Sequence, residues 1–134
     1  MMEIKSSTDR PSLRPELRLR LIRERAFFGR GPAHLLSLIE ETQSVRHACM
    51  KMGMSYSKGW KLIKGAEDAL GYPLVERQQG GREGGSSSLT DEARALLKAY
   101  RHLESALTEQ AEHLFARYFA PFLNPAGPFD SGRA

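Results

Sequence analysis

The sequence predicts a mainly α-helical fold with a small β wing and a long C-terminal helix. Residues 44–70 contain two helical patterns separated by a glycine. Residues 73–89 contain two short strand patterns around a glycine-rich loop. An apolar repeat that alternates steps of three and four residues then begins at residue 93. Together these observations predict a winged helix-turn-helix with a dimerisation helix.

Composition limits the chain to one domain with appendages. It has 134 residues, of which 40% are hydrophobic and 27% charged, and its formal net charge is +4. No apolar run approaches the roughly 20 residues that a bilayer span requires. The N-terminal segment lacks the apolar core of a secretory signal, and a single cysteine cannot form an internal disulfide. We therefore expect a cytoplasmic protein without a membrane partner.

The N-terminal third predicts an arm, a strand and a helix. Residues 1–14 are polar and aperiodic, which predicts a flexible arm, and the winged domain is expected over residues 15–89. Residues 17–21 alternate apolar and basic side chains, the pattern of a strand. Pro32 suits the first position of a helix, and the leucines after it predict a buried face that ends near Thr42.

Residues 44–70 predict two helices joined by a tight turn. Ser44 and Ser55 are the expected N-caps, and Gly53 ends the first helix. Cys49, a small residue four before that glycine, lets the helices cross closely and is expected to be a buried, inert thiol. Between residues 42 and 66 there is no acidic residue and there are five basic ones, which would attract phosphate: Arg46, Lys51, Lys58, Lys61 and Lys64.

Residues 73–134 predict a wing, a long helix and a tail. Strands are expected at residues 73–77 and 87–89, and Thr90 is expected to cap a helix over residues 90–119. Such a helix would extend about 45 Å, which favours a coiled-coil dimer over packing on its own domain. Prolines and a glycine predict a disordered tail over residues 120–134. The residues predicted to form the dimer seam are Ala93, Leu96, Tyr100, Leu103, Leu107 and Leu114.

The residues expected to meet DNA come from the turn-helix and the wing. Lysines on a helix often form only a solvated face, but in this motif they could neutralise phosphates or meet guanine edges. Tyr56 could contact a base or pack, Ser44 could anchor a phosphate or act only as a cap, and Trp60 is expected to pack beneath the wing. The predicted set is Ser44, Arg46, Ser55, Tyr56, Ser57, Lys58, Lys61, Lys64, Arg77 and Arg82.

The order of elements and several segments resemble the N-terminal domain of ModE-type regulators, the molybdate-responsive relatives of the LysR-type winged helix group. The segments are FGRG at 28–31, IEETQS at 39–44, MGMSY at 52–56 with Trp60 following, and LVER at 74–77 through GGREGG to Leu89 and Thr90. The resemblance implies control of genes for molybdenum uptake or molybdoenzymes, most simply by repression.

Two departures from that family follow from the sequence. The family's C-terminal molybdate-sensing domains are expected to be missing, so no cofactor is predicted. Gly59 stands where the family usually has alanine, and Gly65 adds a second glycine to the reading helix. Each glycine costs about 1 kcal/mol relative to alanine, so the helix is expected to be ordered partly by its DNA.

The function expected from the sequence is a homodimeric transcriptional regulator on a palindromic operator. The alternatives are a non-specific architectural DNA binder and a dimeric protein-interaction adapter that binds no nucleic acid. A third possibility is oxyanion binding at the dimer interface. The histidines and the cysteine show no metal-ligand spacing, and no side chains have the partner spacing of a catalytic site, so neither a metal nor an enzyme is predicted.

Overall fold

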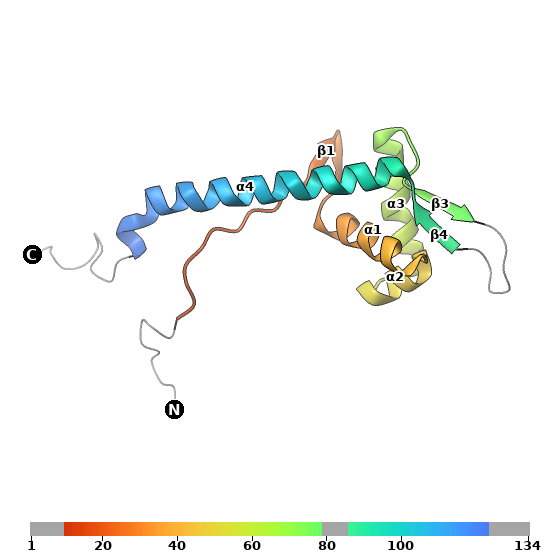
Figure 1. Ribbon diagram of the computed structural model, residues 1–134, viewed down its shortest axis with the longest axis horizontal. Coiled ribbons are helices and arrows are strands. Elements are labelled where there is room, and N and C mark those ends of the chain that lie inside the picture. The colour runs from red at the N-terminus through yellow and green to blue at the C-terminus, as the bar shows by residue number, and fades with distance from the viewer. Residues whose placement is uncertain (1–9, 79–85, 124–134) are drawn as a thin grey trace, which may run out of the picture. The chain divides into compact units, whose positions relative to one another are not determined.

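The computed structural model describes residues 10–78 and 86–123 (Figure 1). These residues divide into two units, one of residues 18–104 and one that joins residues 10–17 to residues 105–123. The predicted fold class is confirmed, because helices dominate and a small antiparallel strand pair follows the helix-turn-helix. The elements are β1 (Leu21–Arg23), β2 (Arg25–Phe28), α1 (Arg30–Thr42), α2 (Val45–Met52), α3 (Tyr56–Leu70), β3 (Val75–Gln78), β4 (Ser86–Leu89) and α4 (Asp91–Leu123).

The core of the first unit lies between α1, α2, α3 and the start of α4. Its fully buried side chains are mostly leucine and isoleucine, each of which contributes about 1.5–3 kcal/mol when removed from water. Pro32 is the third residue of α1 and not, as predicted, the first; a missing N–H costs nothing at either position, because the first four donors of a helix have no partner inside it. The largest of the buried side chains are Leu35, Leu36, Ile39, Leu74, Leu89 and Cys49.

The strand predicted at residues 17–21 is wrong. Strand structure begins only at Leu21, where β1 and β2 form a hairpin that turns at Glu24 with φ of 69°. Residues 17–20 have no strand beside them, and the carbonyl of Leu19 instead accepts a hydrogen bond of 2.8 Å from the hydroxyl of Tyr100. Alternation of side chains predicts two faces, but a strand also needs a neighbour to pair with.

The helix-turn-helix has the predicted caps. The hydroxyl of Ser44 accepts from the amide of His47 at 3.0 Å, and that of Ser55 accepts from the amide of Lys58 at 3.1 Å. Gly53 ends α2 with φ of 70°, a left-handed conformation that glycine adopts at little cost.

Helices α2 and α3 cross at a contact between Cys49 and Gly59. A Cβ atom built on Gly59 would lie only 2.2 Å from Sγ of Cys49, so the crossing has no room for alanine at that position. Cys49 is buried as predicted, and burial raises the pKa of its thiol by disfavouring the charged thiolate. The cysteine therefore fills space between the two helices.

Several hydrogen bonds join the wing to the rest of the domain. The amide of Ser87 in β4 donates to the carbonyl of Gln43 at 2.9 Å, on the turn between α1 and α2. The carboxylate of Glu67 on α3 accepts from the amide of Leu74 at 2.7 Å. The hydroxyl of Thr90 donates to the carbonyl of Pro73 at 2.9 Å and accepts from the amide of Ala93 at 3.0 Å, which confirms the predicted cap.

The predicted end of the last helix at residue 119 is wrong, because α4 continues to Leu123 with Pro121 inside it. Proline close to a helix end removes only one intrahelical hydrogen bond. The rings of Phe115 and Phe119 stack with centroids 4.7 Å apart, and those of Phe119 and Phe122 are 5.3 Å apart, which favours the extra turn. Residues 124–134 of the predicted tail and residues 1–9 of the predicted arm lie outside the described residues.

Two residues of the predicted dimer seam are instead part of the domain's own core. Ala93 has no exposed surface, and Tyr100 is only 3% exposed and packs edge-on against Phe28 with ring centroids 5.2 Å apart. The hydroxyl of Tyr100 is already used by Leu19. These side chains pack within their own chain because the first turns of α4 cover the hydrophobic core.

Candidate nucleic-acid interface

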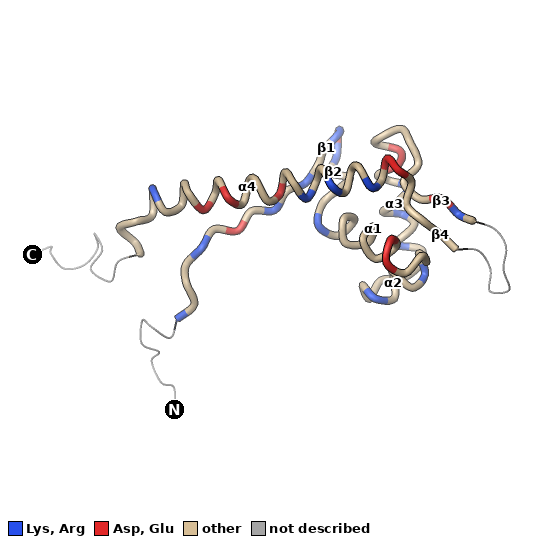
Figure 2. Tube along the Cα trace, viewed as in Figure 1, with Lys and Arg blue, Asp and Glu red and all other residues tan. Residues whose placement is uncertain are grey.

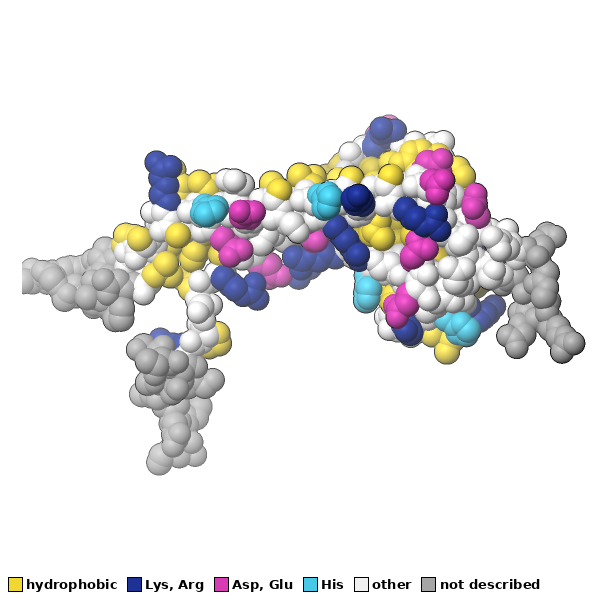
Figure 3. Space-filling model, viewed as in Figure 1, with side chains coloured by type: hydrophobic (Ala, Val, Ile, Leu, Met, Phe, Trp, Pro, Cys, Tyr) yellow, Lys and Arg dark blue, Asp and Glu magenta, His cyan; other side chains and the backbone are white. Residues whose placement is uncertain are grey.

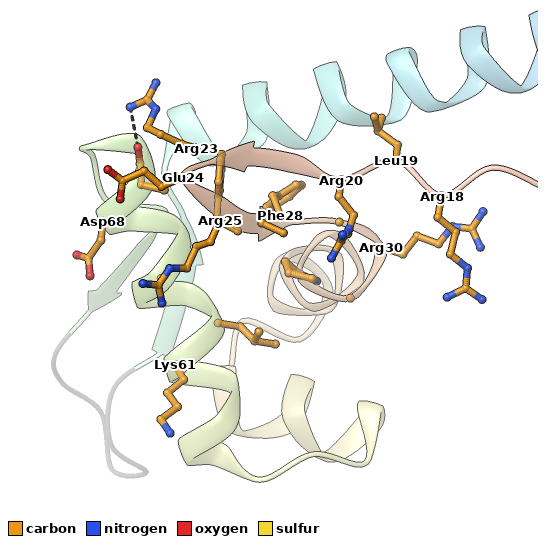
Figure 4. Close-up of a pocket in the computed structure, with 18 residues that line it drawn as sticks. Arg18, Leu19, Arg20, Arg23, Glu24, Arg25, Phe28, Arg30, Lys61 and Asp68 are labelled. Atoms are coloured by element: carbon orange, nitrogen blue, oxygen red, sulfur yellow. Dashed lines mark hydrogen bonds between the residues drawn. The ribbon is translucent and has the colours of Figure 1, made fainter.

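The reading helix α3 has a buried side and an exposed side. Successive residues turn by 100°, so Gly59, Ile63 and Ala66 fall on one side, and the structure buries all three. Six of the residues predicted to meet DNA are exposed on α3 or at its cap. Lys61 extends outward from α3 in Figure 4. The exposed set on α3 and its cap is Ser55, Tyr56, Ser57, Lys58, Lys61 and Lys64.

The three lysines of α3 differ in their partners. Nζ of Lys64 lies 3.3 Å from a carboxylate oxygen of Glu67 and 5.8 Å from the centroid of the Trp60 ring. Within the described part of the chain, Lys58 and Lys61 have no side-chain hydrogen bond or ion pair. The Lys64 side chain is exposed and its charge pair is a single contact, so Lys64 can still exchange Glu67 for a phosphate. The uncompensated positive charge of α3 is therefore on Lys58 and Lys61.

A cluster of cations and aromatic rings joins α2, α3 and the wing. The guanidinium of Arg46 lies 4.6 Å from the centroid of the Tyr56 ring, and that of Arg77 lies 4.6 Å from the centroid of the Trp60 ring. Arg77 also donates to the hydroxyl of Tyr56 at 3.2 Å. The rings of Tyr56 and Trp60 meet edge-on, with centroids 6.4 Å apart. We call these four residues the arginine–aromatic cluster.

The arginine–aromatic cluster shows how Tyr56 and Trp60 pack. Tyr56 packs between two arginines, and Trp60 packs against Arg77 of β3 as predicted. Each exposed cation–π contact contributes about 0.5–1 kcal/mol and fixes the direction of its guanidinium. The cluster thus holds Arg46 and Arg77 beside the N-terminal end of α3.

The remaining predicted residues have simpler positions. The hydroxyl oxygens of Ser44 and Ser55 accept the capping hydrogen bonds of α2 and α3, which is the plain cap role that the sequence allowed for Ser44. Ser57 is exposed in the first turn of α3. Arg82 lies outside the described residues, as does the rest of the wing tip at residues 79–85.

Sequence reasoning missed the basic groove, a groove of about 870 Å³ between the β1–β2 hairpin, the start of α1 and α3 (Figure 4). Six basic and two acidic residues are among those that line it. Figure 2 shows the concentration of Lys and Arg over the hairpin and the start of α1, whereas α4 carries both signs of charge. The signal in the sequence was the excess of basic residues in the first 30, eight against four acidic ones. Periodicity alone could not show that they face α3.

Comparison with known proteins identifies the domain. Residues 33–94, from α1 to the first turn of α4, match the model of the bacterial regulatory helix-turn-helix proteins of the lysR family. The chain is 38% identical over 84 residues to the molybdenum transport protein ModE of Azotobacter vinelandii, covering 60% of this chain and 31% of that relative. Residues 33–94 form a lysR-type helix-turn-helix domain similar to that of ModE proteins. The resemblance predicted from the sequence is confirmed.

Two further relatives bear on the ModE-type domain. The molybdenum transport protein ModE of Herbaspirillum seropedicae is 34% identical over 98 residues, or 73% of this chain and 35% of the relative. The transcriptional regulator ModE of Haemophilus influenzae is 34% identical over 80 residues, or 60% and 31%. The chain therefore spans about a third of the length of these relatives. They are named as transport and regulatory proteins, in agreement with the prediction that the chain is not an enzyme.

Among the described residues, none of the helices combines the length and the apolarity that crossing a membrane requires.

Proposed function

We propose that this chain is a cytoplasmic, DNA-binding transcriptional regulator that places α3 in the major groove. The observation that carries the proposal is the pair Lys58 and Lys61, which are exposed on α3 without an ion partner in the described residues. The arginine–aromatic cluster directs Arg46 and Arg77 to the same end of α3. In helix-turn-helix proteins the N-terminal residues of the second helix contact base edges, and flanking cations contact phosphates.

The proposal includes a homodimer on a palindromic operator. Along α4, apolar side chains remain exposed beyond the domain core (Figure 3). They include Leu103 at 45%, Leu107 at 38% and Leu114 at 48%. Leu96 of the same repeat is half-buried against the core. Apolar residues at alternating steps of three and four form the seam of a two-stranded coiled coil, which supports pairing through the later part of α4.

The genes under control are proposed to serve molybdenum uptake or molybdoenzymes, with repression as the direction of control. This part rests on the names of the relatives, which are molybdenum transport proteins and a transcriptional regulator. In vitro transcription from a promoter that carries the selected operator tests it. RNA output should fall as protein is added, and a rise would show activation instead.

The primary test is DNA binding by the full chain. Duplexes are selected by the protein from a random pool, and their affinity is compared with that of a scrambled duplex by fluorescence anisotropy. Lys58→Glu with Lys61→Glu should weaken binding to the selected duplex at least about tenfold, because two phosphate contacts become repulsive. Lys98→Glu, an exposed lysine on α4, is the control with the same kind of charge reversal.

Each rival function has a different outcome in this test. A non-specific architectural protein would bind the selected and scrambled duplexes equally. An adapter without nucleic acid would bind neither and would not respond to the Lys58 and Lys61 changes. Either result would contradict the proposed function.

We also propose that this chain binds no molybdate as a cofactor. Isothermal calorimetry with sodium molybdate should give no heat of binding. Saturable heat at micromolar molybdate would contradict this part and would revive oxyanion binding at the dimer interface.

A further inference from the structure

We propose that the basic groove binds a phosphodiester backbone of the duplex, on the side of α3 away from the wing. The inference rests on the proposed function, because it assumes that α3 enters the major groove. It adds the hairpin segment, with Arg18, Arg20 and Arg25, to the surface that contacts DNA.

The two flanks of α3 face different parts of the domain. Counted at 100° per residue, Trp60, Lys64 and Glu67 fall on one flank and Leu62, Gly65 and Ala69 on the other. The first flank meets the wing through Arg77 and Leu74. The second flank lines the basic groove opposite the hairpin. Lys61 and Asp68 lie between the flanks, and both also line the groove.

The width of the major groove of B-DNA determines what lies beside a bound helix. The major groove of B-DNA is about 12 Å wide, close to the diameter of a helix with its side chains. A helix in that groove therefore has one phosphate backbone along each flank. The wing can meet only one of the two backbones. The basic groove lies where the other would pass.

Only some of the arginines that line the groove are available to bind phosphate. Arg23 donates to the carbonyl of Ala69 at 2.8 Å, and Arg30 lies 3.4 Å from a carboxylate oxygen of Glu104. The guanidinium groups of Arg18, Arg20 and Arg25, by contrast, make no hydrogen bond or ion pair with any residue that the structure describes. In Figure 4, Arg20, Arg25 and Lys61 lie around the same open face of the groove.

The lining of the basic groove carries an excess of positive charge. The six basic lining residues outnumber the two acidic ones, Glu24 and Asp68. Such a local excess attracts phosphate and favours its fork-like pairing with guanidinium groups. The stem of Arg20 lies across Gly29, since Cγ of Arg20 would be 3.3 Å from a Cβ built there. That packing directs Arg20 along the groove, where an extended chain of phosphates can reach several arginines in turn.

The test measures how DNA affinity depends on salt. Each neutralised phosphate adds about 0.9 to the slope of log K against log salt. Arg20→Gln with Arg25→Gln should therefore lower the slope by about 1.8, so that a rise from 50 to 200 mM salt weakens the variant about twelvefold less than the wild type. The loss should be the same on selected and scrambled duplexes, because phosphates carry no sequence information.

Controls separate this inference from misfolding and from the proposed function. Arg25→Lys keeps the charge and should keep the wild-type slope, and Lys98→Gln removes a charge outside the groove and should also keep it. Circular dichroism confirms that each variant is folded. If the wild type binds DNA with a steep slope and the Arg20 and Arg25 variant retains that slope, the inference fails and the proposed function stands. If the wild type binds no duplex, both fail.

A final arm distinguishes the backbone from a free anion. Calorimetry with inorganic phosphate should give no saturable heat at millimolar concentration, because an open groove does not surround a small anion. Saturable heat that the Arg20 and Arg25 variant loses, with an unchanged slope on DNA, would overturn the inference in favour of a small-anion site.

Discussion

At Gly59 a single hydrogen atom in place of a methyl group sets how closely α2 and α3 can cross. The sequence identified Cys49 as the small residue at the crossing but not the distance between the helices, and it marked Gly59 as a departure from the family pattern. The structure explains that departure, because Sγ of Cys49 occupies the place that a Cβ on residue 59 would need.

Gly59→Ala should therefore destabilise the domain by about 1–3 kcal/mol through overpacking, despite the helix propensity that alanine adds. Gly65→Ala is the matched control in the same helix, where a Cβ meets nothing within 4 Å, and it should stabilise by about 0.5–1 kcal/mol. Urea unfolding measures both. In a Cys49→Ala background the penalty at residue 59 should disappear, and a penalty that persisted would show that the sulfur is not its cause.

At Gln43, in contrast to Gly59, a substitution is expected to stabilise the domain. It ends α1 with φ of 60°, a conformation that favours glycine. Gln43→Gly should raise stability by up to about 1 kcal/mol, the left-handed cost of a side chain less the extra unfolded-state freedom of glycine. The midpoint of thermal unfolding should rise, whereas Gln43→Ala should not raise it. An equal rise for both would show that backbone strain is not the reason.

At the scale of elements, the helical spacing of apolar residues and the capping residues predicted α2 and α3 correctly. Ser44, Gly53 and Ser55 end or begin helices through hydrogen bonds to residues nearby in the sequence, and the structure shows such bonds at all three. The hairpin was missed because alternation in residues 17–21 does not reveal whether a neighbouring strand exists. The groove was missed for the same reason, since its arginines come together with α3 only in the folded chain.

The last helix shows how a heptad repeat can mislead. Ala93 and Tyr100 follow the repeat but are buried by their own domain. Spacing alone cannot tell a partner in the same chain from one in a second copy. The extension of α4 past residue 119 was also unexpected, because Pro121 was interpreted as a stop.

Leu107→Lys tests the proposed pairing of α4. Burying a leucine contributes about 1.5–3 kcal/mol, and a dimer loses two, so its dissociation constant should rise at least about 100-fold. Sedimentation equilibrium measures this change. Thr108→Lys, on the same helix but outside the repeat, should leave the association unchanged. Equal effects of the two changes would exclude this seam.

At the scale of the whole molecule, a symmetric dimer predicts the layout of its operator. Two copies of α3 that enter successive major grooves on one face of the duplex require half-sites about 10–10.5 base pairs apart from centre to centre. Inserting five base pairs between them should abolish tight binding, because the half-sites would then face opposite sides. Selected duplexes without two-fold symmetry would contradict the prediction.

The hydrogen bonds of the wing have a consequence for how the chain reaches its native state. The amide of Ser87 needs the α1–α2 turn in place, and the strand entry at Leu74 needs Glu67 on a formed α3. The contact between Ser87 and Gln43 joins distant parts of the sequence, and the contact at Leu74 needs an ordered α3, so neither can form before the helices have assembled. The wing is thus expected to be among the last parts to acquire native structure and among the first to open, so deuterium should reach the Ser87 amide in partial openings that leave the helices formed.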